Sequence, residues 1–130
     1  YNALDNVRFL PPQPPKHVKS MMQAGDIHLI TMKEAASGLL LPSKFYSSCA
    51  VGRPVIFIGP QTCDLHDHIT KHQCGASIRN NDAKALIQAI LTYRNDGQKW
   101  HDHCFNISTI INDTPHKNLK QWDDLIASIT

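Results

Sequence analysis

Residues 38–59, GLLLPSKFYSSCAVGRPVIFIG, constrain the fold more than any other stretch of this chain. Pro42 suits the first turn of a helix, and a Gly-Arg-Pro break ends that helix before four apolar residues. An apolar run without polar alternation is typical of a strand that is covered on both faces. The apolar side of the helix would comprise Phe45, Tyr46, Cys49 and Ala50. The stretch therefore predicts a loop, a helix and a buried strand, in that order.

Strands and helices are predicted to alternate along the rest of the chain. Three more short apolar runs predict strands at residues 7–10, 27–30 and 74–78. Helical spacing and capping residues predict helices at about 16–24, 63–72, 83–93, 97–111 and 118–129. Parallel neighbours need crossovers that a helix supplies. We expect one α/β domain, a Rossmann-like three-layer arrangement in which helices flank a parallel sheet.

Charge and hydropathy exclude several classes of partner. The formal net charge of +2 comes from 13 basic and 11 acidic residues, and the basic ones are scattered. Nucleic-acid-binding surfaces and polybasic membrane anchors cluster their basic residues. No apolar run approaches the roughly 20 residues of a spanning helix, and no signal peptide opens the chain. We expect a soluble, intracellular protein with no nucleic-acid partner.

The start of the helix at Pro42 is a candidate anion site. The first N–H groups of a helix have no intrahelical partner and carry a partial positive charge. Lys44 could add a full charge and Ser43 a hydroxyl. Right-handed crossovers would bring the ends of the strands to one edge of the sheet, where such sheets bind ligands. The alternative is that Lys44 is an ordinary surface residue and Gly38 only part of a turn.

Two groups of histidine and cysteine contain the residue types that bind zinc. They are His66, His68, His72 and Cys74, and then His101, His103 and Cys104. In a helix His68 and His72 would share a face that His66 does not, and neither C-x2-C nor H-E-x-x-H is present. We expect structural or surface histidines and no metal site.

Structural roles are also expected for His28 and for the cysteines. His28 lies in a predicted strand, where a hydrogen-bonded structural histidine is expected. The four cysteines have no C-x-x-C pair and lie in or near apolar segments. Because disulfides are rare in reducing compartments, we expect free, buried thiols.

Three blocks of sequence together carry a resemblance to a known family. They are AGDIHLITMK, residues 38–59, and CGASIRNNDAKALIQAI. These blocks resemble the carboxyl-terminal domain of GT-B-fold glycosyltransferases, and most nearly the bacterial family-4 type that builds surface polysaccharides of the colanic-acid kind. The resemblance covers about residues 7–93 and is less specific for the last predicted helix.

The resemblance implies a particular domain organisation. Such enzymes have two Rossmann-like domains, of which the first handles the acceptor and the second binds the nucleotide-sugar donor. This chain, residues 1–130, would be a donor-binding domain truncated at its amino end, with the acceptor domain and a glycine-bearing loop preceding Tyr1. The helix at about 118–129 would pack back toward that domain. The full-length enzyme would be cytoplasmic, with possible peripheral association at the inner membrane face.

The resemblance also implies the donor site. The donor diphosphate lies near the start of the helix that begins here at Pro42, so its binding residues would be Gly38, Leu39, Leu40, Ser43 and Lys44. Many relatives have two glutamates seven residues apart, the second of which holds the ribose hydroxyls. Here Leu39 and Ser47 occupy these positions, so neither carboxylate is present. Ser47 and Glu34 are the candidate contacts to the ribose or the sugar, and Glu34 could supply the missing acid.

The implied reaction is transfer of a hexosyl group from a nucleotide diphosphate sugar to a hydroxyl, with retention of configuration and without a metal or other cofactor. Helix N–H groups and a lysine would stabilise the departing diphosphate. This chain alone would be inactive. Two alternatives remain open: a degenerate Rossmann-like binding module without enzymatic activity, and a small metal-dependent protein that uses the histidine groups.

Overall fold

A three-stranded parallel sheet forms the centre of the fold in the computed structural model, which describes residues 4–37 and 42–113. The strands are β1 (His28–Thr31), β2 (Val55–Ile58) and β3 (Gly75–Ile78), in the order β1-β2-β3. In the register, Leu29 pairs with Ile56, and Ile56 pairs with Ala76. The predicted α/β class with a parallel sheet is confirmed.

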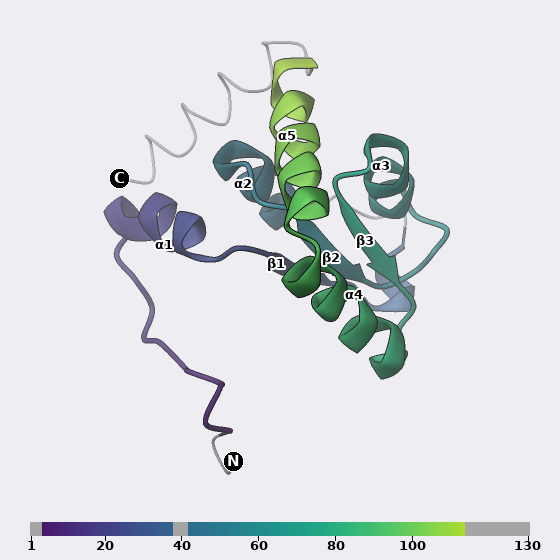
Figure 1. The fold of residues 1–130 in the computed structure, drawn as a ribbon, viewed down its shortest axis with the longest axis horizontal. Coiled ribbons are helices and arrows are strands. Elements are labelled where there is room, and N and C mark those ends of the chain that lie inside the picture. The colour runs from purple at the N-terminus through teal and green to yellow at the C-terminus, as the bar shows by residue number, and fades with distance from the viewer. Residues whose placement is uncertain (1–3, 38–41, 114–130) are drawn as a thin grey trace.

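Helices cover both faces of this sheet (Figure 1). The helices are α1 (Val18–Ala24), α2 (Ser43–Val51), α3 (Asp64–His72), α4 (Ala83–Asn95) and α5 (Gly97–Asp113), with 3-10 turns η1 (Pro15–His17) and η2 (Glu34–Ala36). The crossover helices α2 and α3 pack on one face of the sheet together with the second half of α5, and α4 packs on the other face. The described residues therefore form the expected three layers, helix, sheet and helix.

Two apolar clusters lie on opposite sides of the sheet. The larger one joins β1 and β2 to α2, α3 and the second half of α5, and its members include Ile30, Phe45, Phe57, Leu65, Ile69 and Ile107. The smaller one joins β2 and β3 to α4 and Trp100, around Ile56, Ile78 and Tyr93. Because β2 contributes to both clusters, its side chains alternate between two apolar environments. This explains why its sequence is apolar throughout.

Two glycines permit the turns and the close packing around β2. Gly52 ends α2 with a φ of 63°, a left-handed conformation in which glycine avoids the strain of a side chain. Gly75 begins β3 directly beside Val55, and a Cβ atom there would overlap the Val55 carbonyl oxygen. A larger residue at position 75 would therefore push β3 away from β2.

His28 ties three elements together at the start of β1. Its Nε2 donates to the Met22 carbonyl oxygen of α1 at 2.8 Å, and its Nδ1 lies 2.7 Å from the Ser48 hydroxyl of α2. The exposed fraction is 7% for His28 and 0% for Ser48. Nearby, Arg53 donates from Nη2 to the Gln23 carbonyl oxygen at 3.0 Å. The expected structural role of His28 is confirmed.

The prediction of a strand at residues 7–10 is wrong. In the structure this segment belongs to no helix or strand, and its side chains are exposed, with 82% exposure for Phe9. A strand is stable only when a neighbour satisfies its backbone groups, and among the described residues none lies beside it. The described part of the chain thus has three strands where four were predicted.

The other predicted elements agree with the structure within a few residues. The helix predicted at 97–111 is continuous and extends to residue 113, despite its less regular pattern. The helix predicted at about 118–129 lies outside the described residues. None of the helices in the described segments has the combination of length and apolar character that crossing a bilayer demands.

Candidate ligand site at the carboxyl edge of the sheet

The carboxyl ends of all three strands meet at one edge of the sheet. Backbone hydrogen bonds continue past the strand ends, from Met32 N to Ile58 O and from Gly59 N to Ile78 O, each 2.9 Å long. The loops that follow the strands, at residues 32–37, 59–63 and 79–82, are therefore neighbours. Three helices begin at this edge, namely α2, α3 and α4.

The start of α2 has the features of an anion site. Its N-cap residue is Pro42, and no side chain among the described residues caps the helix. Its first turn contains no acidic residue, and the side chains of Ser43 and Lys44 are exposed. Uncapped N–H groups, the positive end of the helix dipole and a lysine all favour a bound anion.

The starts of α3 and α4 differ from that of α2 in charge. Asp64 and Asp67 lie in the first turn of α3. Asp82 caps α4 by accepting a hydrogen bond from Ala85 N at 3.0 Å. Carboxylates at these positions interact favourably with the helix dipole and repel anions. Among the helices that begin at this edge in the described residues, α2 is therefore the favoured site for an anion.

Ser47 lies one turn further along α2. Its hydroxyl is exposed and donates to the Ser43 carbonyl oxygen at 3.3 Å, a local bond within the helix. The helix surface therefore carries a hydroxyl where the resembling enzymes have a carboxylate. The other predicted donor residues, Gly38, Leu39 and Leu40, lie outside the described residues.

Glu34 is held at the same edge by a residue that the sequence did not single out for the site. Asn80 donates from Nδ2 to Glu34 Oε1 at 2.9 Å and lies 3.2 Å from the Met32 carbonyl oxygen. These bonds join the loop after β3 to the loop after β1, past the end of the intervening strand β2. The second carboxylate oxygen of Glu34 makes no hydrogen bond with any described residue, and the side chain is exposed.

A further polar group connects the loop after β2 to β3. The Ser77 hydroxyl lies 2.8 Å from His66 Nδ1 and accepts a hydrogen bond from Gln61 Nε2 at 3.1 Å. Gln61 also donates to the Gly59 carbonyl oxygen. Catalytic serine and histidine pairs have a third group that orients the histidine ring. No described side chain fills that role for His66, so the group is best understood as a brace for the loop.

The histidine groups do not assemble into a metal site in the described residues. The rings of His68 and His72 stack at 5.7 Å, while His66 binds Ser77. In the second group, His101 packs against Trp100 and His103 bonds to Tyr93. No three histidine, cysteine, aspartate or glutamate side chains gather closely enough in residues 4–37 and 42–113 to hold an ion.

The cysteines are free thiols, as expected, and three of them are buried. Burial raises the pKa of Cys49 to about 12 and that of Cys74 to about 11. Burial also raises the pKa of Cys104, which is only partly buried. Since the thiolate is the nucleophilic form, these cysteines are unsuited to covalent catalysis at neutral pH.

The arrangement at this edge combines two complementary binding capacities. The start of α2 attracts an anion, and the Glu34 carboxylate can accept hydrogen bonds from hydroxyl groups. A ligand that carries both phosphate and hydroxyl groups would use both. When the chain is compared with models of protein families, with curated proteins and with solved structures, nothing matches it.

Proposed function

We propose that this chain is the nucleotide-sugar-binding part of a glycosyltransferase, which transfers a hexosyl group from a nucleotide diphosphate sugar to a hydroxyl acceptor in polysaccharide or glycolipid synthesis. One observation carries the proposal: of the three helices that begin at the carboxyl edge, α2 combines an uncapped start with a lysine and no acid. The sequence resemblance independently assigns the donor diphosphate to this helix start.

Lys44 and Ser43 would bind the diphosphate together with the first N–H groups of α2. Glu34, oriented by Asn80, would accept hydrogen bonds from the ribose hydroxyls. Glu34 would thereby take the ribose-binding role that, in the glycosyltransferases this chain resembles, belongs to the glutamate aligned with position 47. The cation and the carboxylate would contact different parts of one ligand, which fixes the direction in which the nucleotide lies.

In the reaction, the acceptor hydroxyl oxygen forms a new bond to the anomeric carbon as the bond from that carbon to the diphosphate oxygen breaks, and the hydroxyl proton passes to the departing diphosphate. The nucleoside diphosphate leaves with the electron pair, and its added negative charge develops beside the start of α2. Helix N–H groups and Lys44 would stabilise that charge as it develops in the transition state. A preceding domain would bind the acceptor, and the enzyme would work on the cytoplasmic side of the membrane.

Titration of the ¹⁵N-labelled protein with UDP and GDP tests the site. We expect amide shifts in the first two turns of α2 and around Glu34. A hydrogen bond to a charged group contributes about 1.5–3 kcal/mol, so Lys44→Ala should weaken binding of either nucleotide about 10- to 150-fold. The matched control is Lys71→Ala, which removes an exposed lysine from the last turn of α3. That control should bind like the wild type.

Inorganic pyrophosphate separates the two roles. Lys44→Ala should weaken both pyrophosphate and UDP, whereas Glu34→Gln should weaken UDP and leave pyrophosphate unchanged. If neither nucleotide shifts the α2 amides at millimolar concentration, in this chain or in a longer protein that contains it, the proposal fails. The alternative would then be a degenerate binding module, in which the start of α2 is an ordinary helix end. The lack of carboxylates at positions 39 and 47 would favour that alternative.

A further inference from the structure

The outer edge of β3 has backbone groups that no described strand pairs with. Val55 N donates to Cys74 O at 3.4 Å, and Gly59 N donates to Ile78 O at 2.9 Å. Alternate residues of a parallel strand bond to the same neighbour, so residues 74, 76 and 78 face β2. The N–H and C=O groups of Gly75 and Ser77 therefore point away from the sheet.

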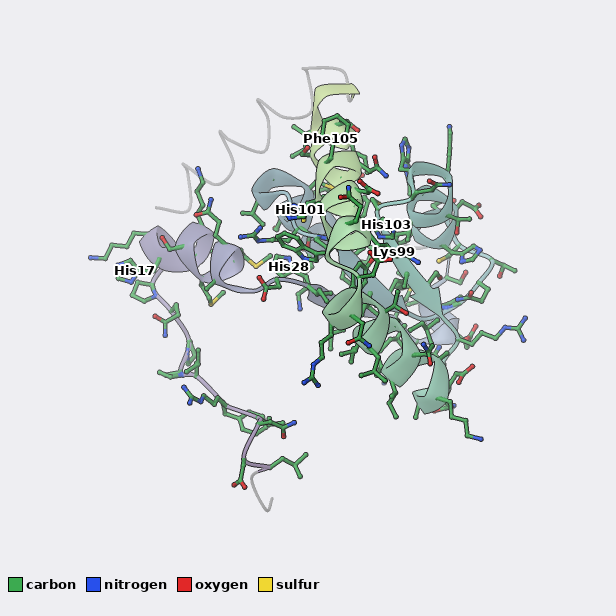
Figure 2. All side chains as sticks on the ribbon, in the orientation of Figure 1. His17, His28, Lys99, His101, His103 and Phe105 are labelled. Atoms are coloured by element: carbon green, nitrogen blue, oxygen red, sulfur yellow. The ribbon has the colours of Figure 1, made fainter. Side chains whose placement is uncertain are left out.

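A slot lies along this edge. It has a volume of about 490 Å³ and is walled by α3 on one side and α4 on the other. The side chains of Thr92 and Tyr93 line the α4 side, and Gln73 lines the end of α3. Lys99 and His103 of α5 close one end, and Figure 2 shows both on the side of α5 that faces α3 and β3. No described residue fills the slot.

The cationic end of the slot lies at the amino end of β3. Helix α4 follows β3 and runs back along it, so the start of α5 returns to the point where β3 begins (Figure 1). Asn106 of α5 donates to the Gln73 carbonyl oxygen at 3.0 Å and fixes this position. His103 Nδ1 is occupied by the Tyr93 hydroxyl at 2.7 Å. Lys99 is exposed, and its ammonium forms no ion pair with the described residues.

We propose that this slot binds the carboxyl-terminal segment of a partner protein as an added antiparallel strand. The main chain of the segment would pair with Gly75 and Ser77, and its terminal carboxylate would lie at Lys99. The direction follows from charge, because an antiparallel strand ends at the amino end of β3, whereas a parallel strand would place its own amino end beside the lysine. This site lies on a different edge from the proposed nucleotide site and does not depend on it.

The test uses an N-acetylated peptide, Thr-Val-Thr-Val-Thr-Val, with a free carboxylate, and the same peptide with a terminal amide. Titrated into the ¹⁵N-labelled protein, the acid should shift the Gly75 and Ser77 amides and bind more tightly than the amide. Lys99→Ala should weaken the acid about two- to fivefold, as expected for an exposed ion pair, and leave the amide unchanged. Lys84→Ala, which changes an exposed lysine of α4 outside the slot, is the matched control.

Three results would overturn the proposal. The first is an absence of shifts in β3 with either peptide at millimolar concentration. The second is equal affinity for acid and amide, which removes the carboxylate contact. The third is binding of acetate as tight as that of the peptide acid, which would make the slot a small-anion site. Circular dichroism of each variant establishes that it is folded, so loss of binding cannot be confused with unfolding.

Discussion

Replacement of Ser48 by alanine should destabilise the fold, although the change removes a single hydroxyl. Ser48 is fully buried, and its hydroxyl lies 2.7 Å from His28 Nδ1 and 2.9 Å from the Lys44 carbonyl oxygen. Met22 O can only accept, so His28 Nε2 carries a hydrogen, and the single hydrogen of the Ser48 hydroxyl lies between two acceptors, the Lys44 carbonyl oxygen and, in the neutral ring, His28 Nδ1. Alanine at position 48 leaves this nitrogen buried without a partner.

The magnitude follows from the cost of an unpaired buried polar atom, about 1–3 kcal/mol. Alanine also favours the helix by about 0.5 kcal/mol relative to serine, which offsets part of the loss. The net decrease in the free energy of unfolding should be about 0.5–2.5 kcal/mol, which lowers Tm by about 2–10 °C for a domain of this size.

Ser47→Ala is the control, because the two serines are adjacent in α2 and both lie near the carbonyl oxygen four residues earlier. Ser47 is exposed, so its replacement should change stability by less than about 0.5 kcal/mol. Urea unfolding followed by circular dichroism measures both variants. In a His28→Leu background Ser48→Ala should lower the free energy of unfolding by a smaller amount, because the imidazole that would lose its partner is absent. Equal unfolding midpoints for the two single variants would refute the argument.

Two further predictions concern ionisable groups. Burial, followed by the charge of Lys99, lowers the pKa of His103, while Asp102 raises it to a smaller extent. Below about pH 6.5 the unfolded chain therefore binds more protons than the folded one, so the contribution of His103 to the free energy of unfolding is complete above that pH and is lost as the pH falls through the folded pKa. His103→Gln should reduce the loss of unfolding free energy between pH 7.5 and 5. Identical pH profiles of the wild type and the variant would contradict this. A thiol reagent at pH 8 should modify the partly buried Cys104 first and leave Cys49 and Cys74, which are buried and have a raised pKa, unmodified until denaturant is added; fast modification of all thiols in the native protein would contradict this.

The central strands and helices could be predicted from the sequence because local and global preferences agree there. The apolar run of β2, the break at Gly52 and the cap at Asp82 each act within a few residues, so the pattern contains the whole cause. The segment at residues 7–10 has the same kind of apolar pattern but is exposed in the structure. A strand depends on a neighbouring strand that is often distant in sequence, and an apolar run does not specify that neighbour.

The candidate site was predictable in part for the same reason. The exposure of Ser43 and Lys44 at the start of a helix follows from local sequence, and the structure agrees. The bond from Asn80 to Glu34 spans 46 positions and depends on the order of the strands, which the pattern does not fix. The available signal was a polar residue soon after the end of β3. Asp82, and not Asn80, caps α4, so the Asn80 side chain is available to bond to Glu34 across the end of the sheet.

Helix α5 belongs to both sides of the molecule, and this affects how the protein opens. Near its start, Trp100 packs against the smaller apolar cluster and donates to the Asp26 carbonyl oxygen at 2.9 Å. Further along, Ile107 and Ile110 belong to the larger cluster with α2 and α3. Because α5 contributes to both apolar clusters, neither cluster can separate from α5 without exposing apolar side chains of the other. Partial unfolding is therefore costly. The proposed donor helix α2 is thereby part of the same cooperative unit as α4 on the opposite face.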